Sequence, residues 1–132
     1  MTFRFTVSAV LAASPKEVYD AWLDGRKHGA MTGARARGSK KVGGTFAAWD
    51  DYISGRNLIL EPGKRIVQAW RTTQFSDKDP DSQIELLLTR VAGGTKLTLR
   101  HTKVPDGHES YRDGGWRENY FAPMKAYFAK KK

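Results

Sequence analysis

The sequence contains histidine, carboxylate and serine side chains, which often act in catalysis or bind metals. Their spacing, however, matches few known catalytic or metal-binding motifs. The three histidines, His28, His101 and His108, stand far apart, and none belongs to a His-x-x-x-His pair. The chain has no cysteine, so only His, Asp and Glu side chains remain as metal ligands. We therefore expect no metal site, no other cofactor and no disulfide.

Carboxylates gather in the segment DKDPD, where Asp77, Asp79 and Asp81 alternate as they do at the start of a calcium-binding loop. The calcium pattern then needs glycine at its sixth position and glutamate at its twelfth, but these positions hold Ser82 and Leu88. The segment is therefore interpreted as a solvated hairpin loop. Because no G-x-S-x-G motif occurs either, no catalytic residue is assigned.

His101 is the polar side chain whose position most invites a function, because it shares one strand face with Leu97 and Leu99. Two interpretations stay open. The imidazole is either a hydrogen-bonded and inert interior group, or a polar anchor in an apolar pocket near Trp116 or Tyr120 of a closing helix.

The start of the chain alternates apolar with polar residues over positions 2 to 12, which is the period of a half-buried strand. The same stretch, MTFRFTVSAVLAAS, also has the crude outline of a signal peptide. The alternation favours the strand, and the absence of cysteine agrees with a reducing compartment. We therefore expect a cytoplasmic protein.

Residues 14 to 25 carry the signals of a helix. Ser14 is placed as the N-cap, Pro15 in the first turn, Glu17 as the partner in a capping box, and Gly25 as the stop. From Gly33 onwards, turn residues recur every eight to twelve positions, the spacing of hairpins in an antiparallel sheet.

The last segment, GGWRENYFAPMKAYFAKKK, combines aromatic and charged residues in the pattern of an amphipathic helix. Its apolar stripe comprises Trp116, Tyr120, Phe121, Met124, Tyr127 and Phe128. Pro123 lies inside this pattern and is expected to kink or restart the helix, because it lacks a backbone N–H.

The order of strand, helix, about six antiparallel strands and C-terminal helix predicts an α+β fold with its helices on one face of the sheet. A length of 132 residues predicts a single domain over residues 1–132. The net charge of +9 is spread along the chain, so we expect no specific nucleic-acid partner. No run approaches the roughly 18 apolar residues that span a bilayer, so we expect no membrane partner.

Three segments, GGTFAAWDDYISGRNLILEPGKRIVQAWR, DSQIELLLTRVAGGTKLTLRHTKVP and GWRENYFAPMKAYF, resemble the domain named for the activator of the heat-shock chaperone ATPase. That family lies in the START and birch-pollen-allergen-like superfamily, also called SRPBCC. The most specific pieces are Gly55 with LEPGKRIVQAWR, the strand from Thr95 to His101, and the spacing from Trp116 to Tyr120. The resemblance covers residues 3 to 128. It implies a START-like helix-grip fold, in which six or seven antiparallel strands wrap around a long C-terminal helix and enclose a hydrophobic cavity.

The resemblance also implies ligand binding, since stand-alone members of the superfamily mostly bind small molecules. We expect a small hydrophobic or aromatic molecule to lie between the sheet and the C-terminal helix. The candidate ligand-binding residues are Trp49, Trp70, His101, Trp116, Tyr120 and Met124. Strand parity leaves open whether Trp49 or its neighbours Ala48 and Asp50 point inward.

Two alternatives remain. The first is a chaperone co-factor in the stress response, or another protein-interaction module, whose basic residues Arg35, Arg37, Lys40 and Lys41 face an acidic partner. The second is a cyclase- or hydrolase-type enzyme, which needs a buried carboxylate or histidine with a perturbed pKa. The resemblance implies that eukaryotic activators carry an additional N-terminal domain for the chaperone contact, so ligand binding is expected ahead of full ATPase activation.

Overall fold

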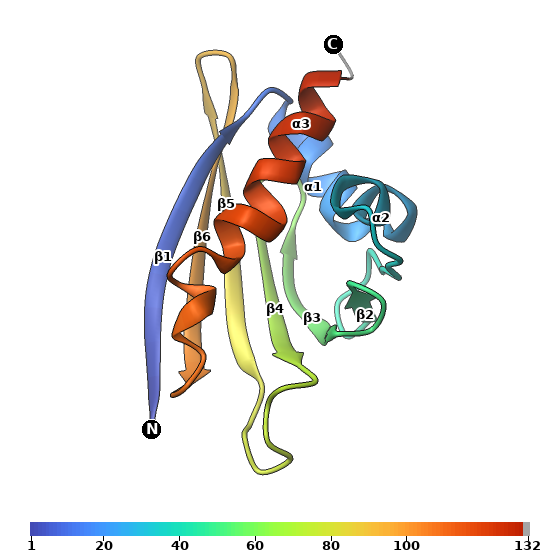
Figure 1. Cartoon of the computed structure of the whole chain (residues 1–132). Helices are drawn as coiled ribbons and strands as arrows, with labels where there is room; N and C mark the ends of the chain where they lie inside the picture. The colour runs from blue at the N-terminus through green and yellow to red at the C-terminus, as the bar shows by residue number, and fades with distance from the viewer. Residues whose placement is uncertain (131–132) are drawn as a thin grey trace.

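The computed structural model describes residues 1–130, which form one six-stranded antiparallel sheet and helices packed on it (Figure 1). The strands are β1 (Thr2–Leu11), β2 (Thr45–Ala48), β3 (Ile53–Glu61), β4 (Arg65–Thr72), β5 (Ser82–Val91) and β6 (Gly94–Pro105). The α-helices are α1 (Pro15–Leu23), α2 (Gly25–Thr32) and α3 (Ala122–Lys130), with a 3-10 turn η1 (Glu109–Tyr111) and a π-helical turn η2 (Arg117–Phe121). The sheet order is β1-β6-β5-β4-β3-β2.

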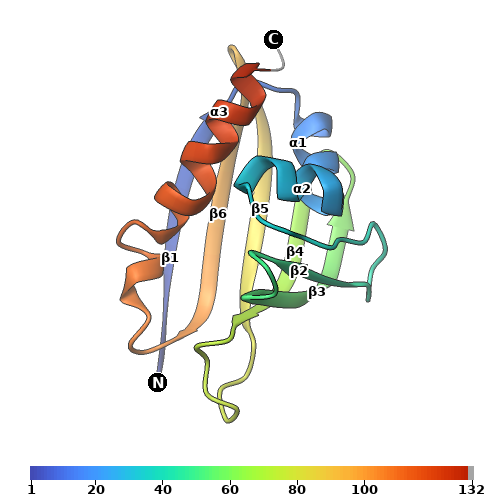
Figure 2. The same ribbon diagram turned by 45° about the vertical axis from the view of Figure 1, so that its right-hand side comes forward.

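The sheet curves around α3, which crosses one of its faces diagonally, and α1 and α2 lie on that same face (Figures 1 and 2). This arrangement is the predicted α+β helix-grip fold. The first and last strands along the chain, β1 and β6, are hydrogen-bonded neighbours in the sheet, with Val7 opposite Leu99. β1 therefore forms one edge of the sheet, directly beside β6.

The predicted start of the first helix is confirmed in detail. The Ser14 hydroxyl accepts a hydrogen bond from the Glu17 backbone N–H at 3.2 Å, and the Glu17 carboxylate accepts one from the Ser14 N–H at 3.0 Å. This capping box satisfies two backbone donors that a helix leaves unpaired at its N-terminus. It fixes where α1 begins, and so where Trp22 of α1 meets the sheet.

The C-terminal segment is helical, but it is not one regular helix. Ala122 donates its N–H to the carbonyl of Arg117, five residues back, so η2 is wound as a π-helix before α3 continues. Pro123 has no N–H to donate, which breaks the regular hydrogen-bond ladder at this point. The irregularity expected around Pro123 thus takes the form of a π-helical turn that ends at Phe121, and α3 runs on through Pro123. π-helical turns of this kind are frequent at functional sites.

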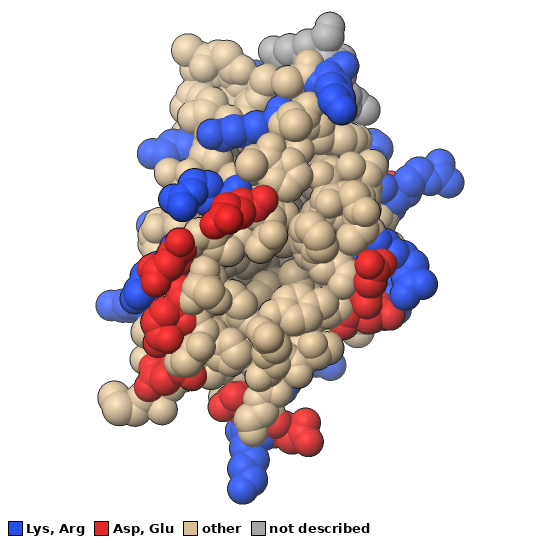
Figure 3. Space-filling view, viewed as in Figure 1, with Lys and Arg blue, Asp and Glu red and all other residues tan. Residues whose placement is uncertain are grey.

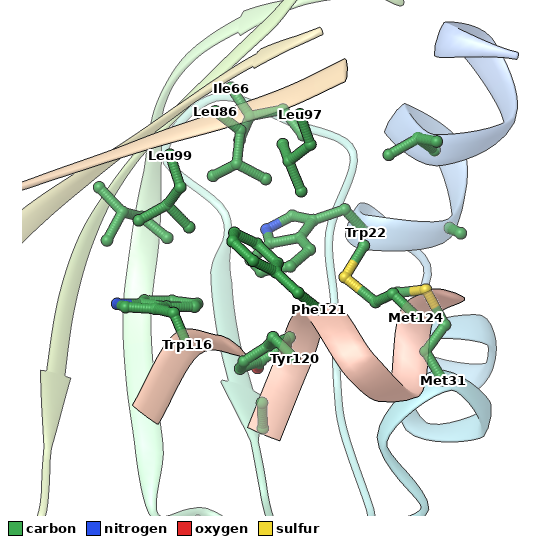
Figure 4. Close-up of a cluster of buried hydrophobic side chains, with 14 of the residues drawn as sticks. Trp22, Met31, Ile66, Leu86, Leu97, Leu99, Trp116, Tyr120, Phe121 and Met124 are labelled. Atoms are coloured by element: carbon green, nitrogen blue, oxygen red, sulfur yellow. The ribbon is translucent and has the colours of Figure 1, made fainter. Parts of the chain in front are cut away.

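The core lies between the helices and the concave face of the sheet (Figure 4). Leu86, Leu97 and Leu99 of the sheet face Trp22 of α1 and Phe121 of η2, and all five side chains are buried. Burying a large apolar side chain contributes roughly 1.5 to 3 kcal/mol to stability. Within residues 1–130, no helix is both long enough and apolar enough to cross a membrane.

Candidate functional site

A pocket of about 760 Å³ opens where the ends of β3 and β4 meet η1 and η2. Figure 3 shows the hollow near the middle of the molecular face, bordered mainly by uncharged surface. Its walls carry six aromatic side chains, Trp49, Tyr52, Trp70, Tyr111, Trp116 and Tyr120. Pockets that hold small organic molecules typically have volumes of roughly 300 to 1,000 Å³ and are lined mainly by apolar and aromatic groups. The size and lining of this pocket fall within that range.

Four of the six residues expected to bind a ligand line this pocket, namely Trp49, Trp70, Trp116 and Tyr120. The other two do not reach its surface. Met124 is fully buried in the core below η2, and His101 is fully buried behind Trp70 and Trp116.

Tyr52 and Tyr111 are wall residues that sequence reasoning missed. Tyr111 stands in the segment between the last strand and the C-terminal helix, five positions before Trp116. Because Tyr111 is aromatic and close to the start of the expected apolar stripe, its position could have identified it as a wall residue. Tyr52 follows a turn and gave no comparable signal. Both hydroxyls are engaged, that of Tyr52 with Gln74 Oε1 at 2.7 Å and that of Tyr111 with the Thr72 hydroxyl at 2.9 Å.

A chain of buried hydrogen bonds fixes the orientation of Trp116. Its indole N–H can only donate, so His101 Nδ1, 3.1 Å away, is the acceptor and carries no proton. The proton of the neutral imidazole is then on Nε2, which donates to the Ser82 hydroxyl at 2.8 Å. Ser82 in turn donates to the Trp70 carbonyl at 2.6 Å. Two wall tryptophans are thus linked through one buried histidine.

Burial lowers the pKa of His101 from 6.5 to about 3, because no charged group nearby compensates for the lost hydration of the imidazolium. The histidine is therefore neutral at physiological pH. Although His101 and Ser82 are in contact, they do not form a nucleophile and its base. The imidazole nitrogen that faces Ser82 is the donor, and the other nitrogen already accepts from Trp116. The arrangement supports the inert interior interpretation of His101.

A second buried histidine orients Tyr120. His28 Nδ1 lies 2.8 Å from the Trp22 carbonyl, which can only accept, so this nitrogen carries the proton. His28 Nε2 is then an acceptor and receives the Tyr120 hydroxyl proton at 2.8 Å. Desolvation lowers the pKa of His28 and raises the pKa of Tyr120, so both groups are neutral. The Tyr120 hydroxyl proton is therefore used inside the core and is not available to a ligand.

Trp49 reaches the pocket from an unusual turn between β2 and β3. Trp49, Asp50 and Asp51 have positive φ angles of 54°, 56° and 73°, a region that costs a non-glycine residue roughly 1 to 2 kcal/mol. Arg35 stabilises the turn, since its backbone N–H donates to Asp50 Oδ1 and its carbonyl accepts from the Asp50 N–H, both at 3.0 Å. The Asp51 carboxylate also lies 3.6 Å from Arg35 Nη2 and 3.7 Å from Arg37 Nη2.

The indole nitrogen of Trp49 is buried and has no hydrogen-bond partner within residues 1–130. Tyr120 is its neighbour, with ring centroids 6.5 Å apart, and the Trp49 N–H offsets part of the rise in the Tyr120 pKa. The two groups nevertheless lack the geometry of a hydrogen bond. An unpaired buried N–H costs roughly 1 to 3 kcal/mol. The Trp49 side chain thus lines the pocket, while its indole N–H is shielded from solvent and lacks an acceptor within residues 1–130.

Within residues 1–130, no three His, Asp or Glu side chains come together as they would around a metal ion. The polar side chains that line the pocket and are available to a bound molecule are Gln74, Ser110, Asp113, Glu118 and Asn119. Such a site can hold and orient a small molecule by apolar contact and a few hydrogen bonds.

Comparison with known proteins connects this architecture to one family. The family model described as "Activator of Hsp90 ATPase homolog 1-like protein" matches residues 12–129. The "Activator of 90 kDa heat shock protein ATPase homolog" of Dictyostelium discoideum is 30% identical over 118 residues, covering 88% of this chain and 30% of the relative. The human "Activator of 90 kDa heat shock protein ATPase homolog 1" is 28% identical over 127 residues, covering 96% of this chain and 37% of the relative. The chain thus spans about a third of the length of the curated relatives it matches.

Solved structures with the same fold include an HSP90 activator from Plasmodium falciparum, with a TM-score of 0.87, 21% identity and coverage of 96% of both chains. CalU16 from Micromonospora echinospora gives a TM-score of 0.76 at 23% identity, covering 97% of this chain and 77% of that one. At these identities the structural likeness supports the fold alone.

Proposed function

The chain belongs to the family of Activator of Hsp90 ATPase homolog 1-like proteins, and we propose that it binds a small hydrophobic or aromatic molecule in the pocket beside η2. The observation that carries the proposal is the wall itself, where three tryptophans and three tyrosines surround about 760 Å³. Aromatic side chains supply large apolar contact areas together with a polar group that can orient a ligand.

The polar groups of the wall favour a ligand with a hydrogen-bond acceptor. The Trp49 N–H is buried and unpaired within the described chain, whereas the Tyr120 hydroxyl proton is already given to His28. If the indole turns towards the pocket on binding, a carbonyl or ether oxygen on the ligand would satisfy the Trp49 donor, which is shielded from solvent and unpaired within residues 1–130. The proposed ligand is therefore a flat apolar body that carries at least one acceptor atom.

Changing Trp49 to phenylalanine tests this proposal. The substitution removes the unpaired donor without breaking any hydrogen bond within residues 1–130. We expect the affinity for acetylnaphthalene, which has a carbonyl acceptor, to fall about three- to tenfold, the effect of losing one hydrogen bond. The affinity for ethylnaphthalene, which has no acceptor, is expected to change much less. Isothermal titration calorimetry of both ligands with both proteins gives the comparison.

Trp22→Phe is the matched control, because the Trp22 indole donates to Gln68 Oε1 at 3.1 Å and does not line the pocket. This variant is expected to lose stability but to keep the ratio of the two affinities. The proposal fails if neither naphthalene binds the unmodified protein, or if Trp49→Phe weakens both ligands equally.

We also propose contact with a heat-shock chaperone as a second candidate function, supported by the names of the relatives. Lys40 and Lys41 are exposed and have no ion-pair partner within residues 1–130, while Arg35 and Arg37 are paired with Asp51. The basic surface available to an acidic partner is therefore smaller than the sequence indicated. A protein that only contacts a chaperone should show no response to the naphthalene ligands.

A further inference from the structure

We propose that the pocket selects an organic cation, a molecule in which a flat apolar body carries a protonated amine. This inference rests on the proposed ligand-binding function and adds the charge of the ligand. The chain contains 23 Lys and Arg against 14 Asp and Glu, yet the charged side chains that line the pocket are Asp113 and Glu118. Both are carboxylates, and no lysine or arginine among residues 1–130 lines the wall.

The two carboxylates differ in their availability. Asp113 is held by its neighbour Arg112 in a two-point contact, with distances of 2.7 Å and 3.1 Å from Arg112 Nε and Nη2. Its charge is largely balanced by that guanidinium. Glu118 makes no ion pair within residues 1–130 and is exposed to solvent at the mouth. It is therefore the carboxylate free to pair with a ligand.

The backbone keeps the Glu118 carboxylate beside the opening. Glu118 belongs to η2 and lies over Gly114, where the carboxylate oxygen Oε2 occupies the space that a Cβ atom would need. Gly114 has a φ of 146°, a conformation that other residues rarely adopt. The Glu118 backbone N–H also donates to the Gly114 carbonyl at 2.8 Å. A glycine at this place thus makes room for a carboxylate at the pocket mouth.

The aromatic wall suits a cation as well. Trp116 and Tyr120 lie 5.0 Å apart between ring centroids, and Trp70 lies 5.4 Å from Trp116. Aromatic rings attract ammonium groups through their negative faces, and tryptophan does so most strongly. Arg117 does not line the wall, but its Nη2 lies 3.5 Å from the same Gly114 Cβ position that Glu118 Oε2 occupies. Figure 3 shows acidic groups near the hollow, with basic groups next to them.

The test uses three naphthalenes of nearly equal size that differ in charge at neutral pH. They are naphthylmethylamine, which is a cation, naphthylmethanol, which is neutral, and naphthoate, which is an anion. We expect the cation to bind about three- to tenfold more tightly than the alcohol, and the anion to bind most weakly. Calorimetric titrations at low and at physiological ionic strength give the three affinities.

Glu118→Gln should reduce the preference for the cation over the alcohol about threefold, because the affinity for the cation falls more than that for the alcohol. Glu61→Gln is the matched control, because it removes the same charge at the far end of β3, while Arg65 keeps its contact with Glu85 at 2.6 Å. Equal binding of cation and alcohol, or tighter binding of the anion, would overturn the cation preference while leaving ligand binding intact. If none of the three binds, the ligand-binding function fails, and this inference fails with it.

Discussion

Replacing Phe128 with alanine is expected to lower the free energy of unfolding by about 3 to 5 kcal/mol, the usual cost of truncating a buried aromatic side chain. Phe128 is only 2% exposed and belongs to the core cluster that joins α3 to the sheet. The loss combines the apolar area returned to water with the void left behind, since packed neighbours relax only in part. Urea unfolding followed by far-ultraviolet circular dichroism measures the change.

Lys125→Ala is the matched control on the same helix, because Lys125 is exposed and alanine is the strongest helix former. Its effect should stay within about 0.5 kcal/mol. A loss below about 1 kcal/mol for Phe128→Ala would show that α3 does not anchor the sheet.

Lowering the pH from 6.5 to about 4.5 is expected to destabilise the fold by about 2 kcal/mol through His101. The pKa of His101 is about 3 in the folded protein and near 6.5 in the unfolded chain. Between these two pKa values the unfolded chain binds a proton at this histidine that the folded protein does not bind. The free energy of unfolding therefore rises with pH and falls on acidification. The lowered pKa of His28 acts in the same direction. Urea unfolding at a series of pH values measures the slope.

His101→Gln is the variant that isolates this effect, because glutamine keeps one donor and one acceptor but does not titrate. It should be less stable at neutral pH and show a flatter dependence between pH 6.5 and about 4.5. Where the variant is too unstable to measure, the NMR shift of the His101 ring proton in the unmodified protein decides. An imidazole that protonates close to pH 6.5 would contradict the buried neutral state.

The elements that could be predicted from sequence are those fixed by local signals. The capping box from Ser14 to Glu17 sets the start of α1, and the alternation along residues 2–11 sets the inward face of β1. The spacing of Trp116 and Tyr120 placed both on one helical face, and both line the pocket. The π-helical turn just before Pro123 leaves Trp116 and Tyr120 on the same side of the helix, although no sequence pattern predicted a π-helix.

The parts that could not be predicted depend on contacts between distant segments. Trp49 reaches the pocket because three consecutive residues adopt positive φ angles, a turn stabilised by Arg35 from a segment 15 positions away. No strand parity could reveal this, since β2 ends at Ala48. His101 was correctly placed on the inward face, but Trp70 and Trp116 cover it and separate it from the pocket. Which inward residue lines a pocket is decided by what packs in front of it.

The indole N–H signals of the four tryptophans provide the most direct test of the proposed ligand site. In nitrogen-labelled protein titrated with acetylnaphthalene, we expect the Trp49 signal to shift most, because its N–H gains an acceptor that residues 1–130 do not supply. The Trp22 signal should hardly move, because its N–H is already bonded to Gln68 and lies outside the pocket. If saturating ligand leaves the Trp49 signal in place, or moves only signals remote from the pocket, ligand binding at Trp49 is contradicted.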